Sequence, residues 1–216
     1  MATRFIDSDR LTALASEEFR SQEPYPWLNE RLLRPEAFDE LCRDFPSLDQ
    51  FEFHQDLARE GGQRPHDRYY LVYESSIYAQ LDHTQRGVVR HDELPKSWQG
   101  FIEELDDSPR YRGFVSRMLG VPDFTARFAW HVGVTHSEVS PHRDSPKKLG
   151  THIFYFNIDR DWDPSWGGET LVLEGKLRAS RIPTSATSVR STARRFSITA
   201  ASCSRTRPAP GTGSRR

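Results

Sequence analysis

Hydrophobic residues in the first 120 positions recur mainly at the spacing of an α-helix. The spacing predicts helices over 11–19, from Pro35 onward, over 98–105 and over 114–119. Ser8 or Asp9 is a suitable N-terminal cap for the first of these helices. Pro35 suits the first turn of the second helix, and Gly120 suits the end of the last one. The first part of the chain is therefore predicted to be mainly helical.

Alternation of apolar and polar residues predicts strands, most of them later in the chain. The predicted strands are 69–73, 124–130, 153–158 and 170–173, and residues 60–67 are predicted to form a loop. Helices first and strands later favour an α+β or mainly β domain over 1–176, with an N-terminal helical layer. No period lasts in residues 177–216, so they are predicted to be a basic, low-complexity, disordered tail.

Composition separates these two parts of the chain. The 216 residues suffice for one domain of ordinary size, and thirteen Phe, seven Tyr and five Trp supply a core. The net charge of −1 is a cancellation, because 1–176 holds 21 basic and 31 acidic residues, whereas 177–216 holds nine Arg and no acidic residue. The acidic body argues against broad nucleic-acid binding, although an Arg-rich tail can contact phosphates.

Membrane and secretory features are not evident in the sequence. No run approaches the roughly 18 apolar residues that a membrane-spanning helix needs, and the first residues lack the apolar stretch of a signal peptide. Cys42 and Cys203 lie far apart and imply no disulfide framework. We therefore expect a cytoplasmic protein without a membrane partner.

The candidate chemistry lies in the segment Pro141-His142-Arg143-Asp144. On an extended backbone, side chains at i and i+2 point to the same side, so His142 and Asp144 can bind one metal ion. With a distant second histidine they would complete the two-histidine, one-carboxylate triad, which leaves positions open on Fe(II) for a co-substrate and O₂. Alone, the pattern also fits a surface histidine beside a turn-forming aspartate.

The residues around this pattern make it more specific. Trp130-His131-Val132-Gly133 precedes it, and the segments 151–157, 161–163 and 166–170 follow it. In this order and spacing, residues 124–175 resemble the prolyl-4-hydroxylase-like branch of the 2-oxoglutarate- and Fe(II)-dependent dioxygenases. The segment 33–38 looks like the first helix of that branch. The resemblance implies a double-stranded β-helix, or jelly roll, with the iron at its mouth.

The resemblance also implies roles for three residues, and strand alternation adds a fourth. His142 and Asp144 match the first two iron ligands. Tyr155 matches the tyrosine that hydrogen-bonds the distal carboxylate of 2-oxoglutarate, and Thr151 lies on the same side by period-2 counting. Core packing is the alternative for Tyr155 and Thr151. The implied cofactors are Fe(II) and 2-oxoglutarate, with ascorbate as a further candidate, and the implied reaction hydroxylates a small molecule or a protein side chain.

The sequence departs from the family at the third iron ligand. All eight histidines lie at or before His152, whereas the family expects a distal histidine and then a basic residue well after Asp144. His131, His136 and His152 are expected to be structural or exposed. The last core strands of the jelly roll are therefore missing as well. Two protein ligands in place of three predict weak Fe(II) binding and little turnover.

A shifted reading frame would account for this departure. Shifted codons across 202–204 give an apolar run, and those across 210–213 permit Trp-His-Gly, with the histidine at position 212. The compositional break then marks a frameshift within 174–182. A genuine basic tail is the alternative. Two other functions stay open, a non-catalytic chain with a binding role and a nucleic-acid-binding protein that uses its arginines.

Overall fold

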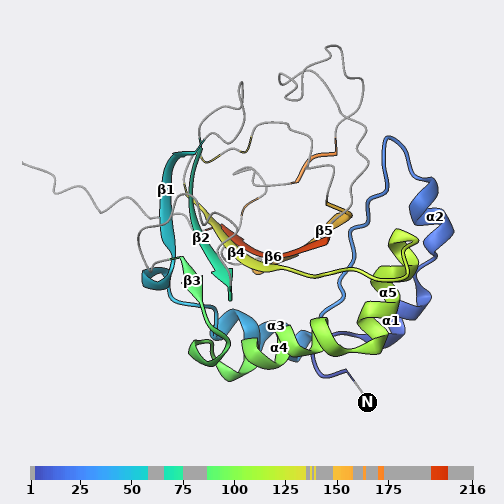
Figure 1. Cartoon of the computed structure of the whole chain (residues 1–216), viewed down its shortest axis with the longest axis horizontal. Helices are drawn as coiled ribbons and strands as arrows, with labels where there is room; N and C mark the ends of the chain where they lie inside the picture. Colours follow the sequence, from blue (N-terminus) through green and yellow to red (C-terminus); the bar gives the residue numbers. More distant parts are fainter. Residues whose placement is uncertain are drawn as a thin grey trace, which may run out of the picture.

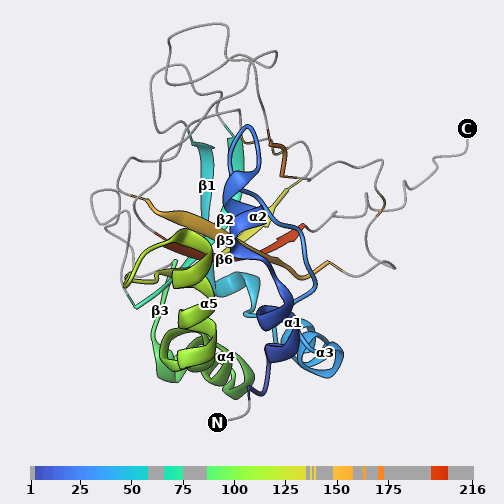
Figure 2. The same ribbon diagram turned by 90° about the vertical axis from the view of Figure 1, so that its right-hand side faces the viewer.

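Six strands within the described residues form one mixed sheet, with helices packed against one of its faces (Figures 1 and 2). The computed structural model describes residues 3–57, 66–74, 87–134, 137, 139, 148–157, 163, 170–172 and 196–203. The helices are α1 (Ser8–Ala13), α2 (Ser16–Ser21), α3 (Pro35–Arg43), η1 (Leu48–Gln50), η2 (His91–Glu93), α4 (Lys96–Asp107) and α5 (Pro109–Leu119). The strands are β1 (Glu52–Leu57), β2 (His66–Tyr73), β3 (Val88–Val89), β4 (Phe128–Gly133), β5 (Gly150–Tyr155) and β6 (Phe196–Cys203).

The α+β prediction is confirmed by this arrangement. The strands lie in the order β1-β2-β4-β6-β5, and β3 pairs with β2 outside this order. Pairs β1–β2 and β2–β4 are antiparallel, whereas β4–β6, β6–β5 and β2–β3 are parallel. Because β6 lies between β4 and β5, it is the strand through which β5 joins the rest of the sheet.

Three helix predictions hold, because α3, α4 and α5 cover the helices predicted from Pro35, over 98–105 and over 114–119, and one prediction needs correction. The helix from Pro35 is α3, and Gly120 ends α5 in the left-handed conformation, with φ of +67°. The prediction of one helix over 11–19 is wrong, because extended backbone at Leu14 separates α1 from α2. The cap of α1 is Asp7, whose carboxylate accepts two backbone N–H groups, rather than Ser8 or Asp9.

The strand predictions hold near the middle of the chain and fail toward its end. Predicted strands 69–73, 124–130 and 153–158 overlap β2, β4 and β5, although β4 begins later, at Phe128. Residues 170–172 form no strand. Conversely, β6 lies within the segment 177–216, where the sequence pattern predicts no regular structure, and the rest of that segment lies outside the described residues.

The core lies between the sheet and the helices and is rich in aromatic rings. Trp98 of α4 packs against Trp130 of β4 and against Phe156 just after β5, with ring centroids 5.4 and 5.1 Å apart. The Glu104 carboxylate of α4 accepts backbone N–H groups from residues 4–6 at 2.6–3.2 Å. Buried rings and this carboxylate therefore hold the N-terminal segment and the sheet to one helix. Among the described helices, none is long and apolar enough to cross a membrane.

Candidate functional site

The sheet has one face in the core and one face of different character. Leu71, Trp130 and Phe154 point into the core beneath the helices, as part of the main apolar cluster. Their sequence neighbours point the other way, because side chains alternate along a strand. This second side carries a small buried cluster of Tyr70, Val72 and Ala129 as well as polar side chains. We call it the polar face and define it by Glu52, His54, Arg68, Tyr70, His131, Thr151 and Tyr155.

Strand register places these residues in rows across the polar face. Glu52 of β1, Tyr70 of β2 and His131 of β4 lie opposite one another in one row. Tyr155 of β5 belongs to the same row, because the backbone of Ala201 in β6 pairs with both His131 and Tyr155. The row therefore connects the far edge of the sheet with the strand that carries the predicted co-substrate residues.

Tyr155 and Thr151 lie on the polar face, as period-2 counting predicts. Both are exposed, and Tyr155 is 45% exposed, so core packing does not explain either residue. The Tyr155 hydroxyl hydrogen-bonds Thr170 Oγ1, so Thr170 also lies on this side of the sheet. A tyrosine hydroxyl fixed by one partner and open to solvent is suited to donate to a ligand oxygen.

The predicted metal ligands His142 and Asp144 lie outside the described residues. Their segment connects Gly133 at the end of β4 to Gly150 at the start of β5. His136 also falls outside them. Within the residues that the structure does describe, no group of three His, Cys, Asp or Glu side chains is placed to hold a metal ion.

His152 has a structural role, as the sequence predicts. Its side chain points to the core side of β5, where its ring stacks on Phe154 with centroids 4.1 Å apart. The Tyr111 hydroxyl of α5 lies 2.8 Å from His152 Nδ1 in a hydrogen bond. Burial lowers the pKa of His152 to about 4 and raises the pKa of Tyr111 well above its usual value. The imidazole is therefore neutral near pH 7.

Sequence reasoning missed the other half of the polar face, on β1 and β2. The Arg68 guanidinium lies over the Tyr70 ring at 5.3 Å, and His131 meets the same ring edge-on at 4.5 Å. His54 Nε2 lies 3.2 Å from a Glu52 carboxylate oxygen. The sequence offers one indication of this half of the site, the charged Arg68 just before the apolar run 69–73. The same pattern is equally typical of the end of a strand.

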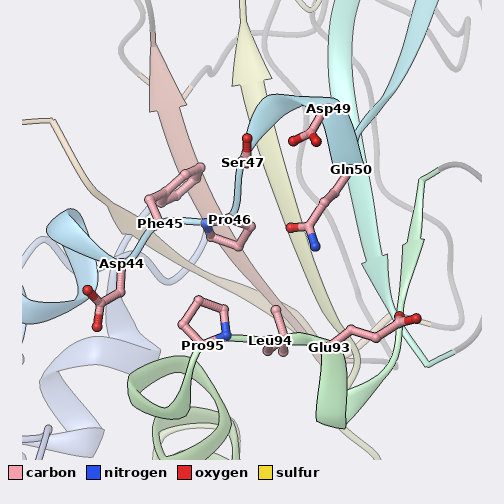
Figure 3. A pocket seen from close by; sticks show the side chains of 9 residues that line it. All are labelled: Asp44, Phe45, Pro46, Ser47, Asp49, Gln50, Glu93, Leu94 and Pro95. Carbon is pink, nitrogen blue, oxygen red and sulfur yellow. The ribbon is translucent and has the colours of Figure 1, made fainter.

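A shallow hollow of about 530 Å³ lies elsewhere, between the segment 44–50 and the turn before α4 (Figure 3). Two of its carboxylates already have protein partners. The Asp44 carboxylate accepts hydrogen bonds from Ser97 and Arg43, which lower its pKa, and Glu93 accepts the backbone N–H of Arg90 at 2.8 Å. Turn and helix-start contacts therefore account for these two carboxylates in the lining of the hollow.

Comparison with models of protein families, with curated proteins and with solved structures finds no match for this chain.

Proposed function

We propose that this chain descends from the 2-oxoglutarate- and Fe(II)-dependent dioxygenases of the prolyl-4-hydroxylase-like branch, with a jelly-roll domain and impaired turnover. In this proposal the polar face receives 2-oxoglutarate near Tyr155 and Thr151. His142 and Asp144 supply two of the three protein ligands for Fe(II), with ascorbate as a candidate reductant. The substrate is a small molecule or a protein side chain.

The observation that carries the proposal is the placement of Tyr155. Its exposed hydroxyl, the exposed Thr151 and the bonded Thr170 share the side of the sheet that faces away from the helices. A co-substrate carboxylate needs such donors on an accessible surface, because a carboxylate accepts hydrogen bonds and donates none. A tyrosine that serves only to pack the core would instead lie on the core side of β5, as the buried Phe154 does.

Low turnover follows from the ligand count. The sequence provides His142 and Asp144 but no histidine after His152. A Fe(II) ion held by two side chains in place of three loses affinity, since each ligand contributes to both binding and geometry. This same absence favours the alternative function, a non-catalytic chain that keeps a binding role on the polar face.

Replacing Tyr155 by phenylalanine is expected to weaken 2-oxoglutarate binding about tenfold, since a hydrogen bond to a charged group contributes about 1.5 kcal/mol. The measurement is calorimetric titration of the full chain with 2-oxoglutarate in the presence of Mn(II). Tyr73→Phe is the matched control, because Tyr73 lies on the core side of β2 and its hydroxyl hydrogen-bonds His91. Equal losses in the two variants, or none in Tyr155→Phe, would contradict the assignment.

A further inference from the structure

Arg68 is a partly buried cation whose polar atoms are not fully used. Its Nε and Nη2 atoms are shielded from solvent and have no hydrogen-bond partner. The neighbours in its row are His54 on β1 and Gly133 on β4, and Gly133 presents no side chain. The guanidinium thus lies on the polar face with two donors, Nε and Nη2, that no described residue accepts.

The protein compensates this charge only in part. The Tyr70 ring offers a cation–π contact at 5.3 Å, which is weaker than a bond to a carboxylate. Within the described part of the chain no carboxylate forms an ion pair with Arg68, and Glu52, the acid in the next row, lies against His54 instead. Burial accordingly lowers the pKa of Arg68. A shielded cation that no described carboxylate neutralises is costly for folding, and a bound anion would offset this cost.

An anion bound at Arg68 would be distinct from the carboxylate expected at Tyr155. Strand order puts three strand spacings between β2 and β5, or about 14 Å between the backbones that carry the two residues. Arg68 also lies one row further along the sheet than Tyr155. One carboxylate cannot bind both residues across this span, so the polar face offers two separate positions for charged groups.

We infer that Arg68 binds a carboxylate of a small-molecule substrate, with Tyr70 and His131 beside it on the polar face. The guanidinium fork donates two parallel hydrogen bonds to a carboxylate, a geometry that fits the unused Nε and Nη2 donors. Describing the ligand as the substrate rests on the proposed function. The binding of a carboxylate at Arg68 does not, because neither metal nor 2-oxoglutarate takes part in it.

The test uses the full chain without metal, in the presence of a chelator. The probes are N-acetylglycine and its uncharged match, N-acetylglycinamide, each followed by calorimetry and by the shift in melting temperature. We expect the carboxylate to bind and the amide not to bind, and Arg68→Gln to weaken carboxylate binding at least about tenfold. Arg31→Gln, at an exposed position, is expected to bind like the unaltered chain. Equal response to the two probes, or unchanged binding by Arg68→Gln, would overturn the inference.

A second variant separates ligand binding from a structural role. Arg68→Met removes the shielded charge but keeps an apolar stem, so its ligand-free melting temperature is expected to equal or exceed that of the unaltered chain. The carboxylate-induced shift is expected to vanish in the same variant. A large fall in the ligand-free melting temperature would show that Arg68 serves the fold, and would overturn the inference.

The same variants distinguish the two sources of carboxylate. With Mn(II) present, Arg68→Gln is expected to bind 2-oxoglutarate as the unaltered chain does. An equal loss of 2-oxoglutarate binding would assign Arg68 to the co-substrate and overturn its assignment to the substrate. If the unaltered chain fails to bind 2-oxoglutarate, the proposed function fails, while the comparison of N-acetylglycine with its amide still decides the role of Arg68.

Discussion

Replacing Trp98 by alanine is expected to lower the free energy of unfolding by about 4 kcal/mol, the usual cost of emptying a large aromatic site. Trp98 is 2% exposed and joins α4 to β4 and to the end of β5 through rings of Trp130 and Phe156. Its indole N–H also donates to the Leu41 carbonyl of α3, at 3.2 Å. The truncation therefore removes contacts of α4 with α3 and with the sheet. It also leaves the buried Leu41 carbonyl without its hydrogen-bond donor.

Urea denaturation of the full chain measures this loss. Because ordinary domains are stable by only about 5–15 kcal/mol, the variant is expected to approach its unfolding midpoint at low denaturant. Trp27→Ala is the control of equal chemistry, since Trp27 is 47% exposed, and it is expected to change stability by less than about 0.5 kcal/mol. A loss below about 1 kcal/mol for Trp98→Ala would contradict the described core.

Acidification is expected to destabilise the chain through His152 by about 3 kcal/mol between pH 7 and pH 4. In the folded chain burial lowers the pKa of His152 from 6.5 to about 4, so the unfolded chain binds the proton first as the pH falls. The loss therefore begins near pH 6.5, grows down to about pH 4, and is nearly absent at pH 7. Protonation would also place a charge beside Phe154 and against the Tyr111 hydroxyl.

His152→Gln isolates this contribution from that of the carboxylates. The amide stays uncharged at every pH, and its oxygen can accept from the Tyr111 hydroxyl. Comparison at pH 7 gives the packing cost of the change, and only the difference in pH dependence measures the titration. Denaturation at a series of pH values is expected to show a shallower decline for the variant. Parallel curves for the two chains would mean that His152 titrates alike in the folded and unfolded states.

Local periodicity predicted the helices α3, α4 and α5 and the strands β2, β4 and β5, because their apolar residues recur at the spacing of a helix or a strand. It failed where pairing partners rather than local pattern decide the structure. Strand β3 is only two residues long, and in β6 only Phe196 and Ile198 are large apolar residues, followed by five small or polar ones. Such strands depend on tertiary context more than on propensity.

Some residues of the candidate site could be predicted from local pattern, whereas others depend on strand pairing. Counting along β5 placed Thr151 and Tyr155 on one face, since alternation is fixed within a strand. Counting along one strand cannot reveal which residues of other strands share that face. Arg68 and His131 join it only through the register of β2 with β4, which the sequence does not state. His142 and Asp144 remain a sequence prediction, because they lie outside the described residues.

The proposed descent of this chain from Fe(II)- and 2-oxoglutarate-dependent enzymes is tested most directly by titrating Mn(II) into the full chain with and without 2-oxoglutarate. We predict weak Mn(II) binding that 2-oxoglutarate strengthens, and that Asp144→Ala abolishes, because coupled ligands must strengthen each other reciprocally. Mn(II) binding that is indifferent to 2-oxoglutarate and unchanged in Asp144→Ala would contradict the proposed function.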